Sequence, residues 1–110
     1  MDKNLAERVI ELACAIQQIA APTFAEAQRA AYVEQRFTEE GLSQVSQDRL
    51  GNVYGRIAGK TEAPPLIVTA HMDTVFPAGT DLTLERLADK IAGPGIGDNS
   101  LGVAALLGLA

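Results

Sequence analysis

The fold is decided by one stretch near the middle of the chain, residues 66–74, whose sequence is LIVTAHMDT. Residues 66–70 form a short, largely apolar run that is β-branched in its middle and follows two prolines. Such a run predicts a strand that is buried on both faces at the centre of an α/β sheet. His71 follows at the carboxyl end of this strand, where open α/β sheets tend to bind their ligands.

A carboxylate follows this histidine at a useful spacing. Asp73 lies two residues after His71, and side chains at i and i+2 of an extended chain point the same way. Asp73 can therefore orient the imidazole and fix its tautomer, which leaves the other ring nitrogen free for a metal. A lone histidine at a strand end is more often structural than a ligand, so the His-x-Asp pair is what favours a metal site.

The composition excludes several classes of protein. The 110 residues allow at most one domain, 47% of them are hydrophobic and the formal net charge is −5. Without a basic cluster, nucleic acid is not an expected partner. We find neither a signal peptide nor an apolar run of membrane-spanning length, and the single Cys14 fits a reducing compartment. We therefore expect a cytoplasmic protein without a membrane partner, in which Cys14 is a packed or half-exposed thiol.

The first segment is predicted to be a helix that ends before Pro22, because the residue before a proline is pushed out of the helical region. Asp2 or Asn4 can cap its start. Its apolar face consists of residues spaced four and three apart: Leu5, Val9, Leu12, Ile16 and Ile19.

A second helix is predicted to follow directly. Thr23-x-x-Glu26 fits the capping-box pattern, and Gly41 can form a left-handed C-terminal cap onto which Leu42 folds back. The capping box accounts for the Thr23 hydroxyl without a catalytic role. A solvated face is predicted for the charged residues Arg29, Glu34, Arg36, Glu39 and Glu40. Residues 42–47 and 53–58 then predict a hairpin near the edge of the sheet, with a turn at 48–52.

A glycine-rich bend precedes the last segment. Three glycines in the five positions 93–97 require a sharp bend or a close approach, and Asp98 follows them at the start of a helix. A nucleotide-binding loop is disfavoured, because Asp98 stands where a dinucleotide fingerprint needs glycine and no lysine follows Lys90. Imidazole and carboxylate oxygen together suit zinc, or cobalt or manganese. His71 and Asp98 are therefore the predicted metal ligands, although two ligands cannot close a site.

The last helix is predicted to span residues 101–110, with Ser100 or Asn99 as its N-cap. It contains no polar side chain, so we expect it to be buried on all sides against the strand 66–70. We interpret the chain as the N-terminal part of a longer protein that supplies the missing ligands beyond Ala110. The alternative is a complete small domain whose last helix is buried in a dimer.

Two motifs together resemble a known family. His71-Met72-Asp73-Thr74-Val75, followed by the segment 93–99 with sequence GPGIGDN, resembles the co-catalytic zinc metallopeptidase family of glutamate carboxypeptidase, tripeptide aminopeptidase, aminoacylase and acetylornithine deacetylase. Pro22-Thr23-x-x-Glu26 and Asp48-x-x-Gly51-Asn52-Val53 are also similar to that family. The resemblance implies an α/β fold, in which residues 1–110 are the first, incomplete part of a three-layer, mixed-sheet catalytic domain.

The resemblance also implies roles for the site residues. His71 would ligate one of two zinc ions, Asp73 would orient His71 as a catalytic residue, and Asp98 would bridge both ions and precede a cis peptide bond. The implied reaction is amide hydrolysis by a water activated between the two metals. The expected enzyme is a peptidase of the carboxypeptidase or tripeptidase type, and an N-acyl-amino-acid deacylase is the alternative within this chemistry.

The chain also departs from the family's pattern. It reads Asn99-Ser100-Leu101-Gly102 where many members have a lysine-glycine pair, and it lacks the family's general-base glutamate, remaining metal ligands and dimerisation domain. We therefore predict that the 110 residues alone are inactive and bind zinc weakly, and that the full-length protein is a homodimer acting on a peptide or N-acyl amino acid. A truncated, non-catalytic module that keeps the scaffold is the alternative from another class.

Overall fold

The structure is a computed structural model that describes residues 3–110, and it contains three α-helices, one π-helical turn and two antiparallel sheets of two strands each. This composition confirms the α/β class. In chain order the elements are α1 (Lys3–Gln17), α2 (Ala27–Glu39), β1 (Ser43–Gln47), β2 (Val53–Arg56), β3 (Glu85–Arg86), β4 (Ile91–Ala92), η1 (Ile96–Ser100) and α3 (Leu101–Leu109).

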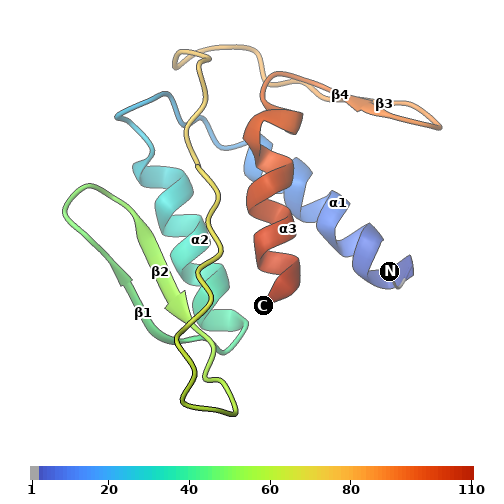
Figure 1. The fold of residues 1–110 in the computed structure, drawn as a ribbon. Coiled ribbons are helices and arrows are strands. Elements are labelled where there is room, and N and C mark those ends of the chain that lie inside the picture. The colour runs from blue at the N-terminus through green and yellow to red at the C-terminus, as the bar shows by residue number, and fades with distance from the viewer. Residues whose placement is uncertain (1–2) are drawn as a thin grey trace.

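The hydrophobic core lies where the three helices meet (Figure 1). Helix α3 packs mainly against α1, while the hairpin β1–β2 packs against α2. The buried core residues come from all three helices: Leu12, Ala13, Ile16, Val33, Phe37, Val103, Ala104 and Leu107. Leu12 and Ile16 belong to the apolar face that the spacing of residues predicts for the first helix.

Helix α1 ends at a buried side chain that fixes two distant loops. Gln17 is fully buried, and its amide donates hydrogen bonds to the carbonyl oxygens of Leu82, at 3.1 Å, and Pro94, at 3.0 Å. The glycine-rich bend is thereby tied to the end of α1. Asn4 lies inside the helix rather than before it, and Asp2 lies outside the described residues. Cys14 is buried, as predicted.

Helix α2 ends as the sequence predicts. Gly41 has φ = 81°, and the N–H groups of Gly41 and Leu42 donate to the carbonyl oxygens of Thr38 and Phe37. These two bonds form a Schellman motif, in which a glycine in the left-handed region satisfies the last free carbonyls of the helix.

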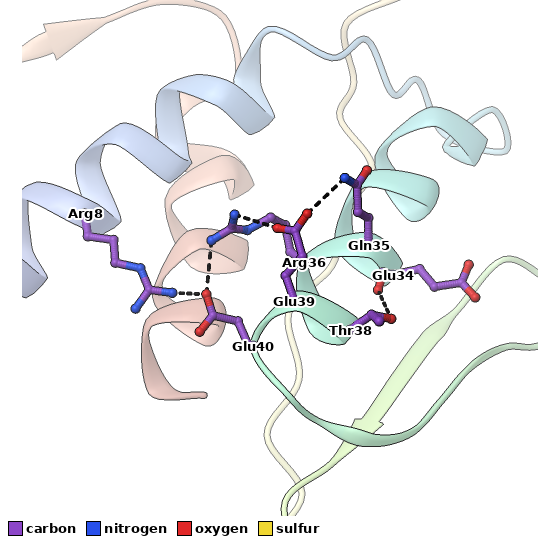
Figure 2. A network of polar contacts seen from close by, with 7 residues as sticks. All are labelled: Arg8, Glu34, Gln35, Arg36, Thr38, Glu39 and Glu40. Carbon is purple, nitrogen blue, oxygen red and sulfur yellow. Dashed lines mark hydrogen bonds and ion pairs between the residues drawn. The ribbon is translucent and has the colours of Figure 1, made fainter.

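Only part of the charged face of α2 is solvated. Arg36 pairs with Glu39, at 2.9 Å, and with Glu40, at 3.0 Å. Arg8 of α1 also pairs with Glu40 (Figure 2). Ion pairs of this kind near the surface contribute little to stability. Arg29 contradicts the prediction of a solvated face, because it is only 1% exposed.

The predicted hairpin is confirmed. Strands β1 and β2 pair antiparallel, and the carboxylate of Asp48 organises the turn between them. It accepts hydrogen bonds from the backbone N–H groups of Leu50 and Asn52 and from the side chains of Asn52 and Tyr54. The hydrogen bond from the Asn52 amide is the main reason why the pKa of Asp48 lies below its ordinary value.

The prediction of a buried central strand at residues 66–70 is wrong for this structure. The segment is extended but belongs to neither sheet, and Leu66 and Ile67 are 90% and 79% exposed. A central strand needs hydrogen-bonding neighbours on both edges, whereas the strands among the described residues pair only with one another. The segment instead runs beside α2 and α3 (Figure 1), where Ala70 and Met72 contact the core.

Helix α3 is buried on one face rather than on all sides. Leu107 is fully buried, whereas Leu101 and Leu109 are 48% and 72% exposed. The difference arises because α1 and η1 make most of the contacts with α3 among the described residues. In the same part of the chain, no helix combines the length and the apolarity that crossing a bilayer requires.

Candidate metal centre

The three predicted site residues lie together. The Nδ1 atom of His71 is 3.1 Å from Oδ1 of Asp73, and the Nε2 atom is 3.1 Å from Oδ1 of Asp98. His71 and Asp73 come from the end of the extended segment, and Asp98 comes from η1, some way along the chain. The imidazole therefore lies between two carboxylates, one at each ring nitrogen.

This arrangement suits a cation at Nε2. A neutral imidazole carries one N–H, and the carboxylate of Asp73 accepts it when the proton is on Nδ1. The lone pair of Nε2 then faces a carboxylate oxygen of Asp98, and two such acceptors need a positive charge between them. A metal ion or a second ring proton supplies that charge.

The distance between the two predicted ligands also fits a metal. Zinc bonds to imidazole and carboxylate are about 2.0–2.2 Å long, so two ligands of one tetrahedral ion are about 3.3–3.5 Å apart. The observed 3.1 Å is close to this value, and the side chains of His71 and Asp98 are 56% and 82% exposed. No group of three or more His, Cys, Asp or Glu side chains able to hold a metal occurs within residues 3–110. The described residues thus bring together two candidate ligands and a carboxylate that contacts one of them.

Asp73 is held by a residue that the sequence assigned to another role. The hydroxyl of Thr23 donates to Oδ2 of Asp73 at 2.6 Å, while Oδ1 faces the imidazole of His71. The Thr23 hydrogen bond is the main cause that lowers the pKa of Asp73, and the His71 contact acts in the same direction. Both bonds stabilise the charged carboxylate that orients the ring.

The capping-box prediction for Thr23 is therefore wrong. Helix α2 begins at Ala27, four residues after Thr23, and no side chain caps it. The carboxylate of Glu26 instead accepts a hydrogen bond from the backbone N–H of Phe24 at 2.8 Å. The loop before the helix is folded on itself, so the Thr23 hydroxyl is available to Asp73.

The glycine-rich bend brings Asp98 to the histidine. Gly95 has φ = 77°, and a Cβ atom there would lie 3.3 Å from the hydroxyl oxygen of Thr74, so the bend needs glycine on both counts. The Asp98–Asn99 peptide bond is cis, as the resemblance predicts.

Asn99 links the two halves of the site. Its side-chain amide donates to the carbonyl oxygen of His71 at 3.1 Å. Ser100 occupies the N-cap position of the last helix, as predicted, but it has helical dihedral angles and no side chain makes the capping hydrogen bond.

This link can be tested through a neighbouring glycine. A methyl group at Gly102 would overlap the side-chain amide of Asn99, so Gly102→Ala should force that side chain away from His71. The gain in helix propensity and the lost hydrogen bond are each worth about 1 kcal/mol, so thermal stability should change little. Zinc affinity should fall about tenfold, the low end for partners that orient a ligand. Asn99→Ala should reproduce this loss, and unchanged affinity in both variants would show that the link is irrelevant to the site.

Sequence reasoning missed three residues that hold the site: Thr23, Arg29 and Asn99. Each acts on the segment 71–73 from far along the chain, through hydrogen bonds to Asp73, Met72 and His71 respectively. Local patterns gave the first two other roles, and the only structural role that they suggested for Asn99 was a helix cap. A charged residue at an otherwise apolar helix position would have been the one signal available for Arg29.

Comparison with known families agrees with the geometry. Residues 52–110 match the model of peptidase family M28, and this range contains His71, Asp73 and Asp98. The match covers more than half of the 110 residues, and the chain belongs to this family of metal-dependent peptidases. No curated protein matches the sequence. The peptidase class is thereby confirmed, while the narrower resemblance to the glutamate carboxypeptidase group stays a prediction.

Proposed function

We propose that residues 1–110 form the N-terminal part of the catalytic domain of a metal-dependent peptidase, with His71 and Asp98 as metal ligands. The observation that carries this proposal is the position of the His71 ring between the carboxylates of Asp73 and Asp98. Membership of peptidase family M28 supports it independently.

Each of the three site residues has a defined part in this proposal. Asp73 holds the imidazole with its proton on Nδ1, so that the lone pair of Nε2 points to the metal position. Asp98 adds a negative charge, and the exposure of both ligands leaves room for water and substrate. Zinc is the proposed metal, with two ions in the complete enzyme and cobalt or manganese as substitutes, and His71 and Asp98 would help to hold it. A bound metal would polarise the amide carbonyl and allow water to act as a nucleophile near neutral pH.

The proposed substrates are peptides, cleaved by an enzyme of the carboxypeptidase or tripeptidase type. The resemblance to the glutamate carboxypeptidase group supports this choice, and an N-acyl-amino-acid deacylase is the alternative. The other alternative is a non-catalytic module that keeps the scaffold. A site with two ligands supports this alternative if no further ligands complete it. A cytoplasmic location, a homodimeric full-length protein and the absence of nucleic-acid and membrane partners remain predictions.

Zinc titration of the chain tests the proposal. His71 is the single histidine, so its ring protons report on the site without assignment. Asp98→Asn keeps the volume of the side chain but removes its charge, and we expect it to weaken zinc binding at least about tenfold. The matched control is Asp89→Asn, an exposed residue between β3 and β4, which should bind as the parent chain does. Equal zinc affinity in Asp98→Asn and the parent chain would overturn the proposal.

The same samples test the predicted inactivity. With zinc, cobalt or manganese present, the 110-residue chain should hydrolyse neither a tripeptide nor an N-acyl amino acid above the metal-only blank, because two protein ligands do not complete a catalytic site. Turnover by homogeneous chain would show that the site is more complete than we propose.

A further inference from the structure

The most unusual buried group outside the predicted site is the guanidinium of Arg29. This residue lies in the first turn of α2, is 1% exposed and is the largest fully buried side chain among the described residues. Burial removes a charge from water at a cost of several kcal/mol unless it is compensated. Such a residue in a small chain requires an explanation.

The hydrogen bonds of Arg29 join two parts of the chain. Its Nε atom donates to the carbonyl oxygen of Ile19 at 2.7 Å, and its Nη1 atom donates to the carbonyl oxygen of Met72 at 2.8 Å. Both acceptors are neutral, and no ion pair to a carboxylate is formed by Arg29 within residues 3–110. The positive charge is therefore held by backbone oxygens, which a neutral donor could also satisfy.

The second acceptor, the carbonyl oxygen of Met72, lies within the candidate metal centre. Met72 is the residue between His71 and Asp73, so Arg29 holds the backbone that sets the spacing of the imidazole and the carboxylate. Next to it, the N–H of Thr74 donates to the carbonyl oxygen of Ala21 at 2.8 Å. The loop after α1 is thus joined to the His-x-Asp segment at two points. One is the hydrogen bond between Thr74 and Ala21, and the other is the guanidinium of Arg29, which bonds to both Ile19 and Met72.

The negative charge of Asp73 influences Arg29. Burial lowers the pKa of Arg29, and the negative charge of Asp73 acts against this decrease. Asp73 is also the residue that Thr23 and His71 hold in its charged form.

We propose that Arg29 is a positioning residue of the metal centre, which fixes the backbone between His71 and Asp73 through its hydrogen bond to Met72. The inference rests on the proposed function, because it assigns Arg29 a role toward the same metal. A purely structural arginine would stabilise the fold without affecting the tautomer of His71, and this difference makes the proposal testable.

The test compares Arg29→Met with Arg36→Met, an arginine of the same helix that pairs with Glu39 and Glu40 instead (Figure 2). Long-range proton–nitrogen NMR correlations of the single imidazole are recorded without metal, at a pH where the ring is neutral. The parent chain and Arg36→Met should hold the proton on Nδ1. Arg29→Met should show a mixture of both tautomers and bind zinc about tenfold more weakly. A parent-like tautomer and zinc affinity in folded Arg29→Met would overturn the proposal.

Two further measurements test the proposal even if Arg29→Met does not fold. Arg29→Lys keeps the charge, but a compact ammonium cannot reproduce the fork that reaches two carbonyl oxygens, so its tautomer ratio should lie between those of the parent and Arg29→Met. In the parent chain, zinc should shift the Nε–H resonance of Arg29 together with the ring protons of His71. If the ring protons shift and the Arg29 resonance does not, the proposal is wrong.

The design separates this proposal from the proposed function. If the parent chain binds no zinc, the proposed function fails, whereas the metal-free tautomer still decides whether Arg29 positions His71. If zinc binds and depends on Asp98 but the tautomer is insensitive to Arg29, only the positioning role fails.

Discussion

Replacing His71 with alanine is expected to lower the zinc affinity of the chain at least about a hundredfold, since even partners that only orient a ligand cost about 10–100-fold when they are lost. His71 is the single histidine, so the variant removes every imidazole from the protein. The remaining candidate, Asp98, is 82% exposed and would hold the metal alone. Isothermal titration with zinc measures the effect.

Asp73→Ala is the matched comparison. Asp73 contacts the ring through Nδ1, on the side away from Asp98, so it orients a ligand without binding the metal. Its loss should cost about 10–100-fold, which is less than the loss of His71. If Asp73→Ala weakens zinc binding more than His71→Ala does, Asp73 is itself the ligand and the assignment of the two residues must be exchanged.

The second large effect concerns stability. Leu107→Ala should lower the free energy of unfolding by about 2–5 kcal/mol, because it opens a cavity at a fully buried position between α3 and the rest of the core. Urea unfolding followed by circular dichroism measures this loss. Since Asp98 lies in η1, directly before α3, the same substitution should also weaken zinc binding.

Leu109→Ala in the same helix is the control for this variant. Leu109 is 72% exposed, so its truncation should change the free energy of unfolding by no more than about 0.5 kcal/mol. A loss as large as that of Leu107→Ala would mean that α3 is buried on all sides, as its uniformly apolar sequence predicts, and that the one-sided packing described here is wrong.

The site shows which contacts a sequence can predict. The pairing of His71 with Asp73 follows from the two-residue period of an extended chain, which is a local property. Asp98 was found through the glycines before it, because a bend of that kind limits where the next side chain can lie. The cis bond after Asp98 came from the resemblance and not from any local pattern.

The errors have a common physical cause. Thr23 fitted a capping box, but its hydroxyl bonds to Asp73, 50 residues away, and no local pattern contains that contact. Arg29 was placed on a solvated face by its charge, although its position in α2 turns it toward Met72. Residues 66–70 have the composition of a central strand, yet a strand is defined by its hydrogen-bonding neighbours, and the segment has none among the described residues.

The fold was predicted best where short-range order decides it. The first helix follows from apolar spacing, and the end of α2 follows from Gly41. The hairpin follows from the turn at Asp48, whose carboxylate satisfies the N–H groups of the turn itself. The packing of α3 could not be predicted in this way, because an evenly apolar helix does not indicate which of its faces meets the core.

X-ray absorption at the zinc edge of the zinc-loaded chain identifies the atoms that bind the metal. We predict one imidazole nitrogen and carboxylate or water oxygens at about 2.0–2.2 Å, and loss of the imidazole scattering in His71→Ala. A sulfur neighbour at about 2.3 Å, which would place the metal at Cys14, or a first shell without imidazole in the parent chain would contradict this prediction.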